Sequence, residues 1–503
     1  MTPCVCDAAS EKGRGRVRTD SRLVSPGDTF VAVGGAKADG NDCVAAALAA
    51  GAVRIVSQAD PPRDLPSGVE WIKAGDSRAA AAAFACADCG HPSRELGVFA
   101  VTGTTGKTTI ANLVRHVLDA SGIPCGLLST VENDTHPLAR PHPVAAANTT
   151  PGPVELQTLF RDAMRNGCKA VAMEVSSHAL DQRRIDGTRL RCAAFTNLTQ
   201  DHLDYHGSME AYAGAKRKLF FPVPAPGPCA IETPPPKTMV VNADDPFGAE
   251  LARCRKELFP GAPALTYGFC EGAGIRVEIS GMDSDGMDVR FDLGRSPVGA
   301  ARPVRFHSRL VGRHNAMNLA AAFGAALCFD LDPERVAQAL ASARPVRGRL
   351  EPVAVPGSPA AFFVDYAHTP DALSKVLSTL REIAGGGRLS VVFGAGGDRD
   401  RTKRPLMGLA CAQGADRLVV TSDNPRSEDP AAIIEDILRG IPSESLGKVA
   451  VEPDRAAALR LAVAQADRSG DVVLVAGKGH ETYQVLAGKT IHFDDREILM
   501  SCN

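Results

Sequence analysis

The stretch VFAVTGTTGKTTIANLV, from Val98 to Val114, decides the fold of the middle of the chain. The apolar run Val98–Val101 predicts a buried strand, and the apolar spacing after Lys107 predicts a helix. Between them, two glycines allow a tight loop whose N–H groups, with the helix N-terminus, attract anionic oxygens. Lys107 can reach the outer phosphates of a nucleotide, and the Thr108 hydroxyl can ligate Mg²⁺. The stretch therefore predicts a phosphate-binding loop in an α/β domain.

The loop departs from the usual phosphate-loop sequence at one position. The pattern G-x-x-x-x-G-K-[ST] places its first glycine where this chain has Val101. The alternative interpretation is an ordinary strand–turn–helix that binds no ligand. The strand before the loop and the helix after it favour the phosphate loop, because that context is what confirms the motif.

The composition is that of an ordinary soluble protein with several domains. A chain of 503 residues is too long for one core, and about three domains are expected. The formal net charge of −2 gives no basic excess that would indicate nucleic acid as the main partner. We expect no membrane span, because no run of about 18 apolar residues occurs. The segment Met1–Ser10 lacks the basic and apolar parts of a signal peptide.

The 14 cysteines are scattered along the chain. Without an export signal they are expected to be free thiols rather than a disulfide framework. Cys86 and Cys89 form a C-x-x-C, and Cys4 and Cys6 lie close together, but neither pair has a partner pair at zinc-like spacing. We therefore expect ordinary thiols in an alanine-rich helix and in the terminus.

Composition and periodicity divide the chain into three regions, 1–94, 95–343 and 344–503. Strands alternate with helices in the second and third regions, which predicts α/β layers with largely parallel sheets. The proline-rich segment after Phe221 is incompatible with a helix or a central strand, and an exposed loop is expected there. Residues 280–294 are expected to form a turn and a strand at the margin of the second region.

Six apolar runs end abruptly in polar residues. In open α/β sheets, ligands bind beyond the carboxyl ends of the strands, so these runs predict one large site between two domains. The six runs are KAVAMEVSSH, CAAFTNLTQDH, AFFVDYAHTP, RLSVVFGAGGDRD, DRLVVTSDNPR and DVVLVAGKGHE.

Several polar residues near these runs have both a functional and a plainer interpretation. Glu174 and His202 could ligate Mg²⁺ with Thr108, although each alone is more typical of structural hydrogen bonding; together with a phosphate loop, the metal is favoured. Lys216 lies on an amphipathic helix, where a solvated lysine is the alternative. Asn315 lies at a helix start and could be only a cap. The segment GGDRDRTKR could be a charged surface loop or an anion site.

The segment SDNPR is more specific. Asn-Pro favours a turn, which would hold Asp423 and Arg426 close together. A carboxylate accepts from an ammonium and a guanidinium binds a carboxylate through two bonds, so the turn could hold both ends of an amino acid. The alternative is a self-satisfied turn with an internal ion pair. These residues favour an ATP-using enzyme with an amino-acid pocket on another domain.

At this point the chain resembles the Mur ligases. The motifs that carry the resemblance occur in order: TGTTGKTT, MEVSSHAL, TNLTQDHLDYHG, GRHNAMN, GRLE, DYAHTPDAL, GGDRDRTKRP, DNPR and GKGHE. The opening TDSRLVSPGDTFVAVGGAKADG is similar to the uridine-nucleotide domain of that family, and the resemblance spans about Thr19 to Glu497. It implies a uridine-nucleotide domain (1–94), a central P-loop ATPase-like domain (95–343) and a C-terminal Rossmann-like amino-acid domain (344–503). A long proline-rich loop and the additional Arg347 depart from the family, and the first 15 or so residues match nothing.

The resemblance also implies site residues. Those expected at ATP are Gly103, Thr104, Thr105, Gly106, Lys107, Thr108, Thr109, Asn315, Arg349, Asp365 and His368. Those expected at the uridine-linked muramoyl dipeptide are Thr19, Ser21, Ala36, Lys37, Ala38, Asn148, Thr149, Thr150, Ser176, Gln182 and Arg184. Those expected at the incoming amino acid are Arg399, Asp423, Asn424, Pro425, Arg426, Gly477 and Glu481. The expected catalytic residues are Lys107, Glu174, His202 and Lys216, and those expected at Mg²⁺ are Thr108, Glu174, His202 and a carbamylated Lys216.

The members that resemble this chain most add meso-diaminopimelate to UDP-N-acetylmuramoyl-L-alanyl-D-glutamate in peptidoglycan synthesis. The resemblance implies that ATP phosphorylates the D-glutamate carboxylate and that the amine of diaminopimelate then attacks the acyl phosphate. The implied cofactors are ATP, Mg²⁺ and N6-carboxylysine at Lys216. A cytoplasmic monomer that acts on small molecules is expected, without nucleic acid or a membrane span.

Three alternatives stay open. A folylpolyglutamate-type ligase has the same fold, but the uridine-like N-terminal region argues against it. A lysine-adding relative is disfavoured by Arg426. A P-loop ATPase or a nucleotide-binding regulatory module would not account for six polar strand ends.

Overall fold

The structure is a computed structural model that describes residues 15–35, 39–296, 299–300 and 303–502. The chain divides into two compact units, and each is described here by itself. The first comprises Met1–Val277, Phe291–Val304 and Met317–Leu340, and the second comprises Glu278–Arg290, Arg305–Ala316 and Ala341–Asn503.

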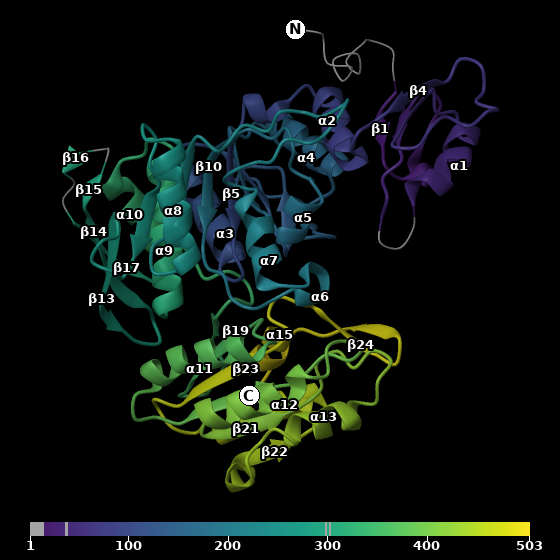
Figure 1. Ribbon diagram of the computed structural model, residues 1–503. Helices are drawn as coiled ribbons and strands as arrows, with labels where there is room; N and C mark the ends of the chain where they lie inside the picture. The colour runs from purple at the N-terminus through teal and green to yellow at the C-terminus, as the bar shows by residue number, and fades with distance from the viewer. Residues whose placement is uncertain (1–14, 36–38, 297–298, 301–302, 503) are drawn as a thin grey trace. The chain divides into compact units, whose positions relative to one another are not determined.

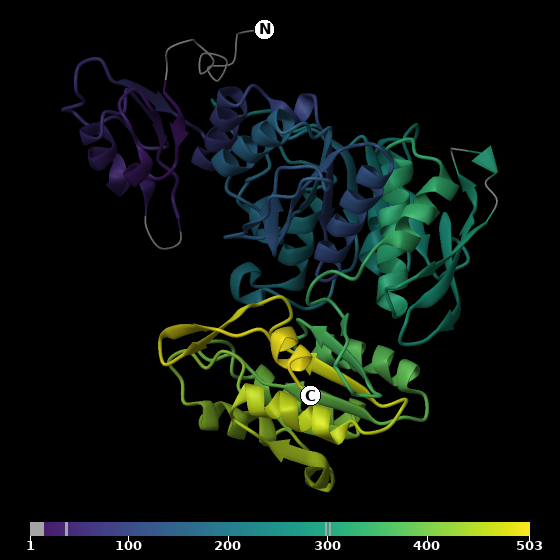
Figure 2. The ribbon, with the colours of Figure 1, turned by 180° about the vertical axis from the view of Figure 1, so that it is seen from behind.

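A four-stranded parallel sheet begins the chain, drawn in purple in Figures 1 and 2. Alternation along the strands gives the sheet two apolar faces: Phe30 packs with the helix α1, while Val31 packs with α2. Cys86 is buried in the alanine-rich α2, as predicted, and every described cysteine is a free thiol. The elements are β1 (Val17–Arg18), β2 (Thr29–Val31), α1 (Val44–Ala49), β3 (Arg54–Ser57), β4 (Glu70–Lys73) and α2 (Ser77–Asp88).

A second sheet of eleven strands forms the centre of the chain. The predicted strand Val98–Val101 lies within its β5, which is buried on both faces, as parallel strands covered by helices are. The expected turn and strand at residues 280–294 lie near one margin of the sheet. Across the sheet the strands are β17 (Val304–Ser308), β14 (Met287–Leu293), β13 (Ile275–Met282), β12 (Leu265–Gly268), β11 (Thr238–Asn242), β10 (Leu190–Phe195), β5 (Gly97–Thr102), β9 (Ala170–Glu174), β6 (Cys125–Leu128), β7 (Glu132–Asp134) and β8 (Val144–Ala145).

Helices cover both faces of the central parallel strands. On one face, Phe160 of α4 and Leu251 of α8 join a core with Met173 and Phe195. Helices α3 and α9 cover the other face (Figure 1). The helices are α3 (Lys107–Ala120), α4 (Pro153–Arg165), α5 (Ser177–Asp181), α6 (Leu203–His206), α7 (Met209–Arg217), α8 (Pro246–Leu258), α9 (Arg313–Leu327) and α10 (Pro333–Ser342).

The proline-rich segment between α7 and β11 has an irregular backbone, as predicted. Its expected exposure is wrong in part, because Cys229 is buried against the first sheet's core. The N–H of Gly75 donates to the Pro228 carbonyl at 3.3 Å. A Cβ at Gly75 would lie 2.3 Å from the Pro226 oxygen, so the segment packs directly against this glycine.

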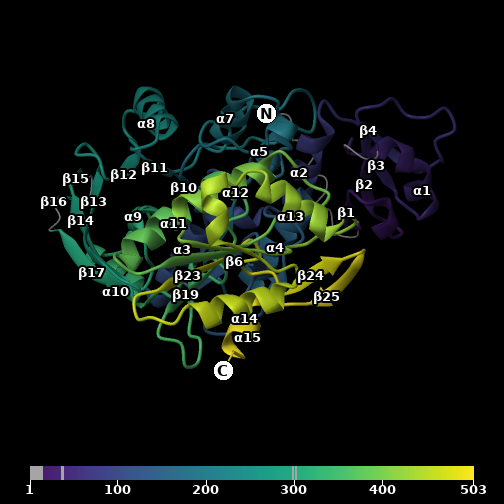
Figure 3. The ribbon, with the colours of Figure 1, turned by 90° about the horizontal axis from the view of Figure 1, so that it is seen from below.

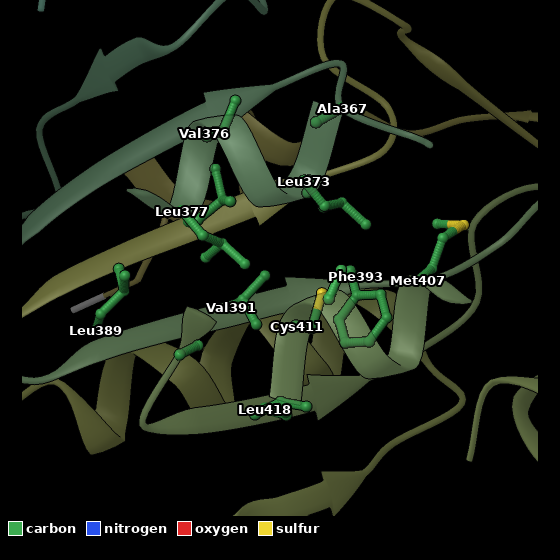
Figure 4. Close-up of a cluster of buried hydrophobic side chains, with 14 of the residues drawn as sticks. Ala367, Leu373, Val376, Leu377, Leu389, Val391, Phe393, Met407, Cys411 and Leu418 are labelled. Atoms are coloured by element: carbon green, nitrogen blue, oxygen red, sulfur yellow. The ribbon is translucent and has the colours of Figure 1, made fainter. Parts of the chain in front are cut away.

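The third sheet has six strands, all parallel except β18. Figure 3 shows α11, α12 and α13 on one face and α14 and α15 on the other. Figure 4 shows the core of the first face, where Leu377, Phe393 and Leu418 pack together. In sheet order the strands are β18 (Glu351–Val353), β19 (Ala361–Asp365), β23 (Val472–Ala476), β20 (Leu389–Phe393), β21 (Arg417–Val420) and β22 (Val449–Val451). The other elements are α11 (Pro370–Ala384), α12 (Lys403–Gly414), α13 (Pro430–Leu438), α14 (Arg455–Gln465), α15 (Asp495–Met500) and the hairpin β24 (Tyr483–Leu486) and β25 (Lys489–His492).

The chain is thus an α/β protein with three domains, each built on one of these sheets, and the predicted class is confirmed. No helix within the described ranges has the length and apolar character needed to cross a membrane.

A buried ion pair joins the two helices behind the third sheet, and it provides a stability test. Arg455 Nε lies 2.7 Å from Asp495 Oδ1, and both side chains are 0% exposed. Arg455→Met should cost about 3–5 kcal/mol of unfolding free energy, because it leaves Asp495 buried without a partner. Arg455→Met/Asp495→Leu should recover most of that loss. Urea titration gives the unfolding free energy of both variants, and hydrogen exchange of the β19 and β23 amides shows whether the loss is local to this sheet. An Arg455→Met variant as stable as wild type would contradict the argument.

Candidate functional site

Three neighbouring strands of the central sheet bring the predicted catalytic residues to one edge. In the register of the sheet, Val101 of β5 is opposite Glu174 of β9, and Thr102 is opposite Phe195 of β10. The loop before α3 therefore begins between the end of β9 and the segment after β10 that carries His202. Two of the six polar strand ends, those of β9 and β10, thus lie on either side of β5, and the expected site between two domains stays a prediction.

The predicted phosphate loop is tightly packed on its neighbours. The N–H of Thr104 donates to Asn197 O at 2.9 Å, and the Thr196 hydroxyl donates to Thr105 O at 2.7 Å. Gly106 has φ 85°, and a Cβ there would lie 2.5 Å from Asn318 Oδ1. Only glycine meets both conditions without strain, which explains its place before the lysine.

Two lysines converge on one carbonyl of this loop. Lys107, the first residue of α3, donates from Nζ to Gly103 O at 2.9 Å and to Thr104 O at 2.8 Å. Lys216 Nζ, from α7, donates to the same Gly103 O at 2.8 Å. Lys216 is 1% exposed, so the solvated-face alternative for this residue is wrong. Burial, and then the Lys107 ammonium, lower the pKa of Lys216 well below its ordinary value.

Glu174 and His202 differ in how firmly they are held. Glu174 is 1% exposed, and its carboxylate accepts from the Thr130 N–H at 2.8 Å. His202 has φ 53° and a half-exposed side chain, and its ring centroid lies 4.9 Å from that of His178. Our sequence analysis missed His178 and also His206, whose Nε2 lies 2.9 Å from Ser177 Oγ. The sequence did contain an indication of both histidines, since each belongs to a polar segment that follows a strand.

The donor atoms at this edge bear on metal binding. The Glu174 carboxylate and the Thr108 hydroxyl are oxygen donors of the kind that Mg²⁺ prefers. A Lys216 ammonium has no lone pair with which to ligate a metal, and its positive charge would repel a cation. Within the part of the chain that the structure describes, no group of three or more His, Cys, Asp or Glu side chains is arranged to hold a metal. The residues therefore fit Mg²⁺ only if phosphate oxygens or a modified Lys216 add negative charge.

Several residues expected at the muramoyl dipeptide form one hydrogen-bonded group beside Glu174. The Thr150 hydroxyl donates to Glu174 O at 3.1 Å and accepts from Ser176 N at 3.0 Å. Arg184 donates to Thr150 O at 2.7 Å and from Nε to Gln182 Oε1 at 3.0 Å.

Other residues expected at this substrate are not hydrogen-bonded to Thr150 in the part of the chain that the structure describes. The Thr149 hydroxyl lies 3.1 Å from that of Thr130, while Asn148 is exposed. Thr19 and Ser21 belong to the first sheet's domain, and Ser21 begins a short 3₁₀ helix. Residues Ala36, Lys37 and Ala38 lie outside the described residues.

In the third domain, three of the residues expected at ATP lie together. The Asp365 carboxylate accepts from Leu350 N at 2.6 Å and Ala367 N at 2.7 Å, and burial raises its pKa. Arg349 lies 4.8 Å from the centroid of the Tyr366 ring. His368 Nδ1 lies 2.8 Å from Tyr366 O, and burial lowers the pKa of this histidine.

Asn315 lies in the first turn of α9, where its side-chain amide donates to Val311 O at 2.9 Å.

Four of the residues predicted to bind the amino acid lie together after the ends of β21 and β23. Asn424 Nδ2 donates to Glu481 Oε2 at 2.8 Å. Gly477 has φ 111°, and a Cβ there would lie 3.6 Å from Asp423 Oδ2. Burial, and then Asp423, raise the pKa of Glu481. The pocket therefore concentrates carboxylates.

Two of the arginines near these residues, Arg426 and Arg399, were predicted to bind the amino acid, and a third, Arg404, forms a buried ion pair. After the Asn424–Pro425 turn, Arg426 Nη1 donates to Gly397 O at 2.8 Å. Among the described ion pairs none joins Arg426 to Asp423, so the self-satisfied turn is not formed. Arg399 is exposed, and its Nη1 donates a long bond to Asp398 O, at 3.4 Å. Our sequence analysis missed Arg404, which is fully buried and pairs with Glu428 at 2.9 Å.

Comparisons with known proteins identify the family of the chain. Three family models match: "Mur ligase family, catalytic domain" at residues 16–87, "Mur ligase middle domain" at 101–326 and "Mur ligase, glutamate ligase domain" at 348–479. The chain belongs to the Mur ligase family. The resemblance that the motifs indicated is confirmed.

Among curated relatives, one from Geobacter metallireducens is 43% identical over 493 residues, which cover 95% of this chain and 92% of the relative. One from Neisseria meningitidis serogroup A is 43% identical over 491 residues, covering 96% and 93%. Both are named UDP-N-acetylmuramoyl-L-alanyl-D-glutamate--2,6-diaminopimelate ligase.

A solved structure of a ligase with that same name superposes with TM-score 0.69 at 31% identity, covering 97% of this chain and 94% of that one. The Thermotoga maritima MurF ligase in complex with ADP, at 19% identity and TM-score 0.59, covers 92% of this chain and 94% of that one and shares the fold.

Proposed function

We propose that this Mur ligase joins meso-diaminopimelate to UDP-N-acetylmuramoyl-L-alanyl-D-glutamate, using ATP and forming ADP and phosphate in peptidoglycan synthesis. The observation that carries the proposal is that the strand ends of the central sheet gather positive charge, whereas those of the third sheet gather negative charge. The central edge gathers Lys107 and Lys216 at a phosphate loop. The third domain gathers Asp423 and Glu481 in one pocket. Named relatives over nearly the whole chain support the same activity.

The three domains divide the work among the substrates. We assign residues 1–94 to the uridine-nucleotide part, 95–343 to ATP and 344–503 to diaminopimelate. The muramoyl dipeptide would be held by the hydrogen-bonded group of Thr150, Ser176 and Arg184, with Thr149 and Gln182. Asn148, Thr19, Ser21 and the segment Ala36–Ala38 are proposed for the same substrate. Both the cytoplasmic location and the monomeric state are proposals that follow from the nucleotide substrates and from the single-chain site.

The chemistry proceeds in two steps. The D-glutamate carboxylate attacks the γ-phosphorus of ATP, ADP leaves, and an acyl phosphate forms. The amine of diaminopimelate then attacks the acyl carbon; the tetrahedral intermediate loses a proton and phosphate and collapses to the amide. The loop from Gly103 to Thr109 holds the phosphates, and Lys107 neutralises charge on the phosphoryl group in transit. The protein acts mainly by positioning and charge neutralisation.

The residues that would hold Mg²⁺ are Thr108, Glu174, His202 and a modified Lys216. When bound, Mg²⁺ supplies positive charge that offsets the charge of the phosphates. Carbamylation of Lys216 is supported by its surroundings, because its ammonium is buried beside Lys107. The Lys216 amine adds to the carbon of CO₂ and loses a proton, which replaces a positive group by a negative one. Asn315, Arg349, Asp365 and His368 are proposed for the adenine and phosphate parts of ATP.

The activity is tested by measuring ADP release from the purified chain. ADP should form only when the UDP-linked dipeptide and an amino acid are both present. Lys107→Ala should lose about 3 kcal/mol or more of transition-state stabilisation, as when one preorganised donor is removed. Release of ADP without the two substrates would instead favour a P-loop ATPase, and near-normal turnover in Lys107→Ala would refute the phosphate-loop assignment.

The proposed modification of Lys216 predicts a specific chemical rescue. Lys216→Ala should be nearly inactive and regain part of its activity with a short carboxylic acid in solution, because the acid restores the negative group. Lys218→Ala is the matched control, since this lysine of the same segment pairs with Asp181 at 2.9 Å and should keep its activity. NMR with ¹³C-bicarbonate should show a carbamate signal in wild type that Lys216→Ala lacks. A wild-type protein without that signal at saturating bicarbonate would contradict the modification.

Amino-acid choice is proposed to depend on Arg426. Diaminopimelate carries a second carboxylate that lysine lacks, and a guanidinium left without it stays unpaired. Sites built for a polar group can reject an analogue that lacks it by about 10⁴-fold or more. Arg426→Ala should therefore lose most of the preference for diaminopimelate over lysine. Arg401→Ala is the control, because its guanidinium is on the same side of the domain but pairs with Glu428 at 2.9 Å.

Side-by-side kinetics with the two amino acids decide the matter. Equal use of lysine by wild type would favour the lysine-adding relative. Unchanged selectivity in Arg426→Ala, or an equal loss in Arg401→Ala, would remove Arg426 as the discriminating residue.

A further inference from the structure

Lys478 lies directly beneath the proposed amino-acid pocket. It follows β23 in the GKGHE motif and is 0% exposed. Its ammonium donates to Tyr483 O at 2.7 Å and to Asn424 Oδ1 at 3.1 Å. It also lies 3.6 Å from Asp423 Oδ1 and 3.6 Å from Glu481 Oε2. A side chain buried and bonded in this way does not reach a substrate, but it contacts three residues proposed to do so.

The first consequence concerns the orientation of Asn424. Its Oδ1 accepts from Lys478 Nζ and from the N–H of Val485, the latter at 3.0 Å. Because two donors face this oxygen, the amide cannot turn over without losing both bonds. The Nδ2 group is thereby directed to Glu481 Oε2, at 2.8 Å. Lys478 thus fixes the direction of the Glu481 carboxylate through Asn424.

The second consequence concerns charge. Burial, and then Asp423, raise the pKa of Glu481, whereas the Lys478 ammonium lowers it. Burial lowers the pKa of Lys478 itself, and both carboxylates raise it. The other charged groups that face Lys478 are Arg455 and Asp495, which pair with each other at 2.7 Å. The rings of Tyr483 and Phe493 lie 5.8 and 6.0 Å away.

The balance of these charges suits one additional cation. Together, Asp423, Glu481 and Lys478 carry a net charge of −1. Asp423 Oδ1 is buried and accepts no hydrogen bond from any described residue, so it can take a donor from a ligand. A substrate ammonium would supply both the donor and the missing charge. Without Lys478 the two carboxylates would repel each other in a desolvated site, and the pKa of Glu481, which burial and Asp423 already raise, would rise further.

We propose that Lys478 is the positioning residue that offsets the negative charge of Asp423 and Glu481 and holds Asn424 in one orientation, so that the pocket receives the ammonium of the incoming amino acid. This inference rests on the proposed function, because it concerns the pocket assigned to diaminopimelate. It assigns Lys478 a role distinct from the residues that contact the amino acid itself.

The experiment compares Lys478→Met and Lys478→Gln with a matched control, Lys448→Met. Lys448 is also in the third domain, but its ammonium donates to the backbone carbonyls of Ala412 and Ala415. In Lys478→Met, KM for diaminopimelate measured on the acid side of the pH profile should rise by about tenfold or more, as expected where a binding carboxyl that is partly protonated has its pKa raised by about one unit or more. KM for ATP and for the UDP-linked dipeptide should stay within about twofold of wild type. The control should match wild type in all three.

The pH profile separates this role from a merely structural one. Loss of the ammonium raises the pKa of Glu481 further, so the acid limb of kcat/KM for diaminopimelate should move to higher pH. Lys478→Gln can keep a donor to Asn424 without the charge, so it should show the same movement with a smaller rise in KM. If Lys478 were merely structural, its variants would have a smaller folded fraction, but the acid limb of their kcat/KM profile would stay at the wild-type pH. An unmoved limb in both variants overturns the proposal.

A stability cycle keeps the test decisive if Lys478→Met folds poorly or if wild type does not use the amino acid. The variants are Lys478→Met, Glu481→Gln and the double variant, compared by urea midpoint without any substrate. Because Glu481→Gln removes one of the repelling carboxylates, the double variant should have a higher midpoint than Lys478→Met. A double variant at or below that midpoint overturns the charge argument. Failure of wild type to use any amino acid would refute the proposed function while leaving this cycle to decide the role of Lys478.

Discussion

The Gly103 carbonyl accepts hydrogen bonds from two ammonium groups, Lys107 Nζ at 2.9 Å and Lys216 Nζ at 2.8 Å, and the central site depends on this convergence. Two like charges this close, one of them 1% exposed, repel each other strongly in a poorly hydrated setting. Loss of the Lys216 proton or arrival of negative charge relieves the repulsion. The loop, the helix α3 and the helix α7 therefore form a site that favours anions, which supports the proposals that a nucleotide phosphate binds here and that Lys216 is modified.

The third domain gathers negative charge, which suits the amine that is proposed to bind there. Asp423 and Glu481 gather around one buried ammonium, and the excess there is negative. In the proposed reaction, the phosphates and a carboxylate would react at the cationic edge, and the amine would bind at the anionic one. Ligation requires an activated carboxylate and an amine that is not trapped by the phosphate site, and this separation of charge would keep the two reactants at different edges before the chemistry begins.

Local patterns were enough to predict the phosphate loop, because the strand, the glycines and the following helix are consecutive in the chain. They also predicted which strands end in polar residues. They failed where burial depends on distant contacts. Lys216 bonds to a carbonyl 113 residues away, so helical spacing alone placed it on a solvated face, and only the family resemblance indicated otherwise. Lys478 went unnoticed because its burial is completed by Tyr483 and Phe493, which follow the motif. The proline-rich loop was irregular as predicted, but nothing in its composition indicated that Cys229 joins another domain's core.

The remaining question is what holds the amino-acid pocket in register, since β21 and β23 are not adjacent and β20 lies between them. Arg455 answers it. Its guanidinium donates to Ala476 O at 3.0 Å and to Ser422 O at 3.4 Å, the residues just before Gly477 and Asp423. One rigid planar group thus spans the ends of two strands and fixes the distance between Asp423 and the GKGHE segment. A buried ion pair such as Arg455–Asp495 often contributes no more stability than apolar residues of the same size. Its value here lies in geometry: an apolar side chain could fill the same space, but it could not bind two carbonyls and so hold the segments that carry Asp423 and Glu481 at a fixed separation.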